Sequence, residues 1–108
     1  PSAHAEVNAI RAAARTLGRP HMDDCVLYAS CEPCPMCLAT SLWAHLPRIV
    51  YAASHAEATR AGFDDTPIAL ALYGAPHPAA CHCLHHHPLT ESSRPFDAWL
   101  AKQDRVPY

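Results

Sequence analysis

The chain has 108 residues and a formal net charge of −2 at pH 7, and Leu, Ile, Val and Phe together occupy 19 positions. A chain of this length fits one domain, and so few bulky apolar residues predict a thin core that a metal, a partner chain or further sequence completes. The net charge is too low for an intrinsically disordered chain. One lysine, Lys102, and seven dispersed arginines provide no basic surface for phosphate backbones, so we expect no nucleic acid as partner.

The cysteine content and the start of the chain bear on where the protein works. No signal peptide and no apolar run of membrane-spanning length occurs, so we expect no membrane partner. Two of the six cysteines fit metal ligation better than a disulfide framework, which predicts a reducing, cytoplasmic environment. The chain begins at Pro1 without an initiator methionine, and we therefore expect further sequence upstream.

The first half of the sequence predicts two helices and two strands. Ala3–Leu17 has apolar residues at three- and four-residue steps and is followed by Gly18, which predicts a helix. Cys25–Ser30 and Arg48–Ala53 are short, continuous apolar runs, as in strands covered on both faces. Pro35–Leu46 lies between them as a second helix. This order predicts a parallel βαβ unit with its functional groups at the carboxyl ends of the strands.

The second half of the sequence has weaker patterns. We expect a short helix over His55–Ala61, capped by Ser54, and then a turn at residues 62–65. A further helix is predicted over Thr66–Tyr73. The last helix, Pro95–Lys102, has a proline in its first turn and its aromatic and leucine residues on one face.

Two short motifs contain the residue types of a catalytic zinc site. Cys34 and Cys37 stand one helical turn apart, and Pro35 suits the first position of a helix. The N–H groups and the dipole at a helix N-terminus favour thiolates, the form of cysteine that binds metal. His4 and Glu6 lie where another helix would start, so His4 supplies a third ligand and Glu6 is free to move protons. Three protein ligands leave an open position, the pattern of catalytic zinc, and this H-x-E and P-C-x-x-C pair is typical of zinc deaminases.

Other uses of the cysteines and histidines stay open on these patterns alone. Cys31 could complete a structural zinc site with Cys34 and Cys37, or the cysteines could form a buried pair. The segment Cys81–His87, with the sequence C-H-C-L-H-H-H, could bind a second metal. It could equally be a loop or an edge strand that is rich in these residues, since its spacing matches no zinc finger or ribbon.

Five segments resemble the cytidine deaminase-like superfamily, and most closely its bacterial guanine deaminase branch. They are H-A-E-V-x-A-I at His4–Ile10, D-D-C-V-L-Y at Asp23–Tyr28, S-C-E-P-C-P-M-C-L at Ser30–Leu38, A-G-F-D-D at Ala61–Asp65 and P-F-x-A-W at Pro95–Trp99. The zinc motifs are shared by the whole superfamily, whereas A-G-F-D-D and the aromatic tail point to the guanine branch.

The resemblance implies an α/β fold with three α/β/α layers and a mixed five-stranded sheet, whose first helix and first two strands are missing from this chain. Residues 1–108 would then be the C-terminal portion of one zinc-dependent deaminase domain. The resemblance also implies a homodimer in which the C-terminal segment, residues 93–108, crosses to the active site of the partner subunit.

The resemblance further implies zinc-dependent hydrolytic deamination of a small nucleobase, with guanine giving xanthine and ammonia. The zinc ligands would be His4, Cys34 and Cys37, and Glu6 would act first as base and then as acid.

Three further residues are predicted to contact the substrate. Asp65 resembles the family's second acid at the guanine edge, although a turn or cap position is the alternative. Trp43, on the helix that holds the zinc ligands, would line the pocket or belong to the core. Tyr108 resembles a pocket wall that comes from the partner chain.

Two alternative functions remain open at this stage. A tRNA adenosine deaminase, or another nucleoside or cytosine deaminase, would share the zinc motifs, but the tRNA enzyme needs a basic surface. A truncated zinc-binding fragment without a complete pocket would bind metal and deaminate no base.

Overall fold

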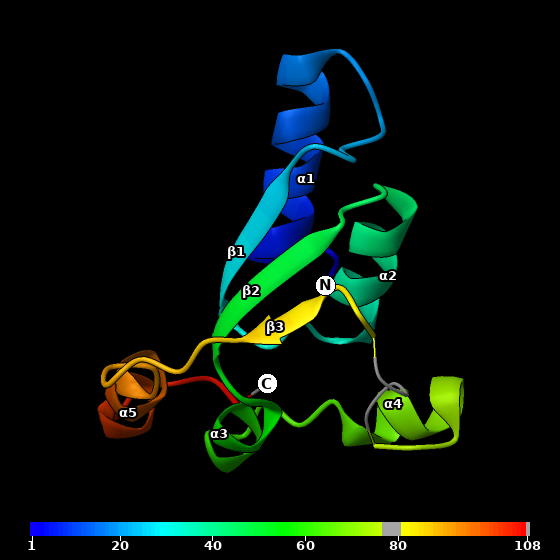
Figure 1. The fold of residues 1–108 in the computed structure, drawn as a ribbon. Helices are drawn as coiled ribbons and strands as arrows, with labels where there is room; N and C mark the ends of the chain where they lie inside the picture. Colours follow the sequence, from blue (N-terminus) through cyan, green and yellow to red (C-terminus); the bar gives the residue numbers. More distant parts are fainter. Residues whose placement is uncertain (77–80, 108) are drawn as a thin grey trace.

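The structure is a computed structural model that describes residues 1–76 and 81–107 (Figure 1). Its sheet has three strands in the order β1-β2-β3, namely β1 (Val26–Cys31), β2 (Arg48–Ala53) and β3 (Leu84–His86). The helices are α1 (Ala5–Leu17), α2 (Pro35–Trp43), α3 (His55–Arg60), α4 (Thr66–Tyr73) and α5 (Arg94–Ala101). The elements predicted from the sequence are all present, with ends displaced by a few residues.

The strands pair in parallel, as the strand–helix–strand order predicted. Leu27 of β1 lies opposite Ile49 of β2, and Ile49 lies opposite Leu84 of β3. Of the alternatives left open for Cys81–His87, the structure shows the edge strand, as β3. Among the described strands every pairing is parallel, so the mixed pairing that the resemblance implied is not seen in this part of the sheet.

One face of the sheet carries the core. Leu27 and Ile49 point to the same side and pack with Ile10 of α1 and Leu38 of α2, and Figure 1 shows both helices alongside the strands. The prediction that β1 is covered on both faces is wrong. Its alternate residues Val26 and Tyr28 are 43% and 77% exposed, because neighbouring side chains of a strand point to opposite faces and the covering helices lie on one of them.

Helix α2 ends three residues before the predicted end at Leu46. His45 adopts a left-handed conformation with φ of +57°, which stops the helix. The N–H of His45 donates to the carbonyl of Leu42, and the N–H of Leu46 donates to that of Ser41, both at 3.0 Å. This is the Schellman arrangement, which usually has glycine at the left-handed position. A histidine there is unusual but is among the residue types that tolerate it best.

Helices α3, α4 and α5 gather beyond the carboxyl ends of the strands (Figure 1). Helix α3 begins with a capping box, in which Ser54 and Glu57 satisfy each other's backbone N–H groups. Helix α5 contacts the α3–α4 connection, where the ring of Phe63 lies 6.1 Å from Phe96 and 5.4 Å from Trp99. This end of the sheet is where the functional side chains converge.

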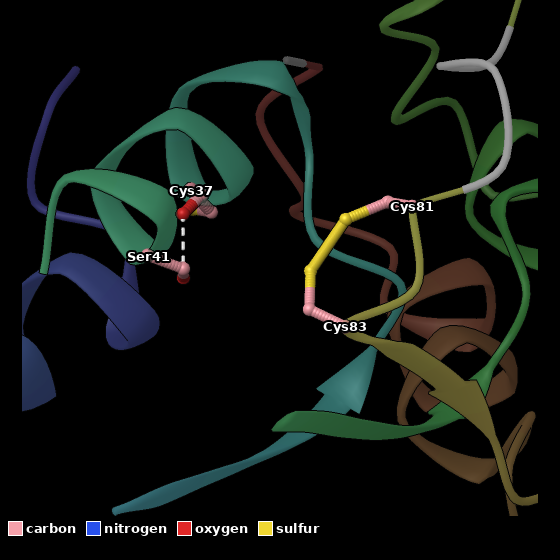
Figure 2. Close-up of a disulfide and its surroundings, with 4 residues drawn as sticks. All are labelled: Cys37, Ser41, Cys81 and Cys83. Carbon is pink, nitrogen blue, oxygen red and sulfur yellow. Dashed lines mark hydrogen bonds between the residues drawn. A yellow bond between two sulfur atoms is a disulfide. The ribbon is translucent and has the colours of Figure 1, made fainter. Parts of the chain in front are cut away.

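A disulfide joins Cys81 and Cys83 just before β3 (Figure 2). Cys83 belongs to the core cluster, and Cys81 packs against it. Among the described residues, no metal-binding group of three includes a member of Cys81–His87, so these cysteines are structural in this fold, whereas the sequence left a second metal site open there. No helix in residues 1–76 or 81–107 is long and apolar enough to cross a membrane.

Candidate active site

The N-termini of α1 and α2 bring His4, Cys34 and Cys37 together. Nδ1 of His4 lies 3.5 Å from Sγ of Cys34 and 3.4 Å from Sγ of Cys37. One donor atom from each of the three residues lies within 4.8 Å of the other two. One imidazole and two thiolates are the donor set of catalytic zinc centres, which use three protein ligands and keep one position open. The residues present therefore fit zinc.

Local backbone structure explains why these ligands are placed so well. His4 and Cys34 are the N-cap residues of α1 and α2, and both have extended backbone angles. Neither side chain caps its own helix; instead, His4 contacts the Cys34 thiol. Pro35 supplies the first position of α2, where its missing N–H costs no hydrogen bond.

The contact between the two thiols shifts their pKa values in opposite directions. The hydrogen bond from the Cys37 thiol, assisted by backbone N–H groups at the start of α2 and by His4, lowers the pKa of Cys34 to about 6. The same bond to Cys34, together with burial and the nearby Glu6 carboxylate, raises the pKa of Cys37. These contacts favour the thiolate form of Cys34, and the thiols give up their protons when a metal binds.

Glu6 lies in the first turn of α1, beside the ligand group. Its Oε2 accepts a hydrogen bond from Sγ of Cys37 at 3.4 Å. Glu6 is not among the three residues that can share a metal ion. A carboxylate in this position is close enough to exchange protons with a molecule held at the open coordination position.

A cavity of about 500 Å³ opens in front of this group. Its size is typical of small-molecule sites. Glu6 and Asp65 both line it, as do the apolar side chains of Phe63, Ile68 and Phe96. The cavity therefore combines a metal group, two carboxylates and aromatic walls, which suits a flat heterocycle with polar edges.

The carboxylate of Asp65 is held by His55. Nδ1 of His55 lies 2.9 Å from Oδ1 of Asp65, and the two side chains are only 15% and 22% exposed. Nε2 of the same imidazole lies 3.1 Å from the hydroxyl of Thr66 and 3.2 Å from that of Thr59. The backbone N–H of His55 donates to Oε2 of Glu32 at 2.9 Å. This chain of contacts positions Asp65 at the cavity.

Several cavity residues were missed by the sequence analysis, namely Glu32, His55, Phe63 and Phe96. A signal for Glu32 and His55 was present, because each closely follows the carboxyl end of a predicted strand, where parallel α/β folds bind ligands. The two phenylalanines lie in the A-G-F-D-D and P-F-x-A-W motifs, but their place in the cavity depends on the meeting of two separate segments in the folded chain.

Trp43 and Cys31 do not join the three ligand residues. Trp43 is 82% exposed at the last position of α2 and does not line the cavity described here. Trp43 lies six residues beyond Cys37 on α2, which is about 9 Å along the helix. Sγ of Cys31 lies 4.0 Å from the carbonyl of Ser54, apart from the three ligands, and burial raises its pKa to about 11, so it is no fourth ligand. Tyr108 falls outside the described residues.

A parallel α/β unit with a His–Cys–Cys group beside a carboxylate, at the carboxyl edge of its sheet, defines a catalytic zinc domain of the deaminase type. Residues 1–53 match the family described as the cytidine and deoxycytidylate deaminase zinc-binding region. The solved structure of guanine deaminase from Bacillus subtilis superimposes on the whole chain, with a TM-score of 0.65 and 43% identity, and the chain covers 68% of it. The chain belongs to the cytidine deaminase-like superfamily and, within it, to the guanine deaminase family. The matched family binds zinc, so zinc is the metal that His4, Cys34 and Cys37 would hold.

Two curated relatives show how far the similarity extends. The chain is 48% identical to guanine deaminase of Bacillus subtilis (strain 168) over 99 residues, which are 92% of this chain and 63% of that protein. It is 36% identical to tRNA-specific adenosine deaminase of Aquifex aeolicus over 53 residues, which are 49% of this chain and 35% of that protein. The chain thus spans less than two thirds of its guanine deaminase relative, and the adenosine deaminase similarity is limited to about half of the chain.

Proposed function

We propose that this chain carries the metal centre and the pocket of an enzyme that hydrolyses guanine to xanthine and ammonia. The observation that carries the proposal is the cavity of about 500 Å³ in which Glu6 and Asp65 stand beside the ligand group of His4, Cys34 and Cys37. The 48% identity with a guanine deaminase over 92% of the chain supports guanine as the substrate.

Glu6 carries the proton transfers. Zinc bound by the three ligands supplies a Lewis acid that lowers the pKa of water in the site. Glu6 accepts a proton from the water that attacks the ring carbon bearing the exocyclic amine. It delivers this proton to the ring nitrogen, then removes the second proton of that water from the new hydroxyl group and delivers it to the amine, which leaves as ammonia. A carboxylate that accepts and returns protons in this way contributes about 10²–10⁴-fold to the rate.

Asp65 recognises the substrate edge. Guanine presents N–H donors, and an ionised carboxylate is an acceptor only. The contact with His55 at 2.9 Å holds the carboxylate in one orientation, so that the acceptor is in place before the base arrives. Phe63 and Phe96, which line the same cavity, supply apolar surface for the faces of the ring.

The charge of the chain favours a free base over tRNA. A net charge of −2 and a single lysine leave too few cations to neutralise several phosphates. Asp64 and Asp65 add negative charge at the cavity. A neutral purine is accepted there, and a nucleic-acid backbone is repelled.

The assembly that we propose is a homodimer in which residues 93–108 reach the active site of the second subunit. Exposed apolar side chains support a further interface, since Tyr28 on the sheet is 77% exposed and Leu72 on α4 is 64% exposed. In the single chain, α5 contacts Phe63 through Phe96 and Trp99, and the exchanged tail would make the same kind of contact between subunits.

The test offers the purified full-length protein guanine, adenine, cytosine, cytidine and an anticodon-stem RNA in parallel, and follows ammonia release. Ammonia from guanine, with xanthine as the second product, is expected. Ammonia from the RNA or from cytidine, with guanine unchanged, would assign the chain to a sibling deaminase. Zinc content without activity on any substrate would favour a zinc-binding module.

A further inference from the structure

We propose a second metal site, for a divalent ion of the zinc class, formed by His21, Asp23 and His45. His21 and Asp23 lie in the connection between α1 and β1, and His45 lies in the connection between α2 and β2. Both connections precede the strands, whereas the catalytic group lies beyond the carboxyl ends of the strands. The two sites are therefore at opposite ends of the sheet, and the second is independent of the proposed function.

The geometry of the cluster suits one metal ion. One donor atom from each of the three residues lies within 4.8 Å of the other two. Nδ1 of His45 is 3.5 Å from Oδ1 of Asp23, close to the separation of about 3.4 Å that two donors have around a tetrahedral zinc with bonds of about 2.1 Å. The imidazoles of His21 and His45 are stacked, with ring centroids 4.0 Å apart and planes inclined by 8°. Because an imidazole lone pair lies in the plane of its ring, the two stacked rings must tilt apart to bind one ion, and both side chains are exposed enough to do so.

The donor set determines the class of ion. Two imidazole nitrogens and one carboxylate oxygen bind zinc, nickel and copper well, whereas calcium and magnesium prefer all-oxygen sites. Water can fill the remaining positions, because the side chains of His45 and Asp23 are 48% and 67% exposed. An ion therefore reaches the cluster without opening the core.

The backbone beneath the cluster is fixed before any ion binds. The N–H of Met22 donates to the carbonyl of Ala44 at 2.8 Å, which ties the two connections together between the ligand positions. Met22 itself is only 2% exposed. His45 is held in its left-handed conformation by the hydrogen bonds that end α2. Binding then requires the ordering of three side chains and no rearrangement of the chain.

An ion at this position would join two segments that are far apart in the sequence. A ligand that binds only the folded state stabilises it in proportion to the logarithm of its concentration over its dissociation constant. The consequence for this protein is a zinc-dependent rise in melting temperature that does not involve the catalytic ligands.

The experiment uses the full-length protein with its catalytic zinc bound and the Cys81–Cys83 disulfide intact. Zinc is added in equilibrium dialysis and, on ¹⁵N-labelled protein, in NMR titration. His21→Gln, Asp23→Asn and His45→Asn are compared with His85→Gln, which removes an exposed histidine outside the cluster. Asparagine is chosen at position 45 because it tolerates the left-handed backbone.

We expect the native protein and His85→Gln to bind one more zinc ion per chain than His21→Gln and His45→Asn. Zinc-induced shifts should be confined to residues 19–25 and 44–47, and the zinc-dependent rise in melting temperature should disappear in both histidine variants. Equal zinc stoichiometry in the native protein and in His21→Gln would overturn the proposal, and so would shifts centred on other histidines. Position 21 has no left-handed backbone, so glutamine fits there without strain.

Discussion

At the scale of single residues, the two carboxylates of the cavity differ in what holds them. Glu6 accepts a hydrogen bond from the Cys37 thiol at 3.4 Å, and this bond ends when Cys37 gives up its proton to a metal. Asp65 is held by an imidazole at 2.9 Å, away from the three ligands. Substitutions at the two positions should therefore have distinguishable effects on metal content, substrate binding and turnover.

We predict that Glu6→Gln retains zinc and lowers turnover of guanine by about 10²–10⁴-fold, because the amide cannot accept and return a proton. Elemental analysis and steady-state rates measure the two quantities. Cys34→Ala should lose the catalytic zinc, whereas Cys25→Ala, at a thiol outside the ligand group, should keep it. Near-normal turnover in Glu6→Gln would remove Glu6 from the proposed mechanism.

Asp65→Asn should impair guanine deamination strongly and leave zinc content unchanged, since an amide presents donors where the base needs an acceptor. Asp64→Asn is the matched control: Oδ1 of Asp64 accepts from the N–H of Thr66 at 3.0 Å, which an asparagine oxygen also does. His55→Gln should produce a milder form of the Asp65→Asn effect, seen mainly in KM. Equal losses in Asp64→Asn and Asp65→Asn would show that only the local charge matters.

At the scale of elements, the helices begin and end by mechanisms that differ along the chain. Helix α1 ends at Gly18 in the left-handed conformation, as predicted, whereas α2 ends at a left-handed histidine. Helix α3 has six residues and depends on its cap, because so short a helix is marginal by itself. This dependence matters for the site, since α3 begins at His55.

The cap of α3 should make stability depend on acid pH. Oε2 of Glu57 accepts from the N–H and the hydroxyl of Ser54 at 2.8 and 2.9 Å, and these bonds lower the pKa of Glu57 below its usual 4.5. A lowered folded-state pKa stabilises the fold above the unfolded value, and this contribution is lost as the pH falls through the folded value.

Glu57→Gln should therefore weaken the decline in stability below about pH 4.5, and Ser54→Ala should cost about 1 kcal/mol at neutral pH. Urea denaturation of both variants across this pH range measures the two effects. Glu91→Gln, at an exposed carboxylate on the surface, is the control. If stability declined with falling pH in Glu57→Gln as it does in the native protein, Glu57 would not be a source of that decline.

At the scale of the whole molecule, the described chain leaves apolar surface uncovered. Helices α1 and α2 pack on one face of the sheet, and the other face carries Tyr28 at 77% exposure. Trp43 is 82% exposed. The proposed dimer would be one way to cover such apolar surface.

We predict that the full-length protein is a dimer in light scattering and that truncation after residue 92 weakens the association and the activity together. The double substitution Phe96→Ala and Trp99→Ala should act in the same direction, because it removes the aromatic contacts of α5 with Phe63. Arg105→Ala, a change in the same tail that removes only exposed backbone contacts, is the control. A stable, fully active monomer would contradict this prediction.

The sequence by itself predicted the elements and the three residues that the fold gathers into a candidate metal group. Local signals mark the end of α1 at Gly18, the start of α2 at Pro35, the cap of α3 at Ser54 and the apolar runs of the strands. The motifs that contain His4, Cys34 and Cys37 are also local, because these residues lie at the starts of α1 and α2. These features depend on neighbours within a few residues, so they can be predicted before the fold is known.

Only the tertiary structure decided the features that depend on distant contacts. The exposure of Tyr28 follows from which face the helices cover, and the early end of α2 from a backbone arrangement that is rare for histidine. The contact of His55 with Asp65 joins the start of α3 to the start of α4, and the His21–Asp23–His45 cluster joins the connections that precede β1 and β2. Both depend on how the elements pack, which fixes distances that residue spacing along the chain does not contain.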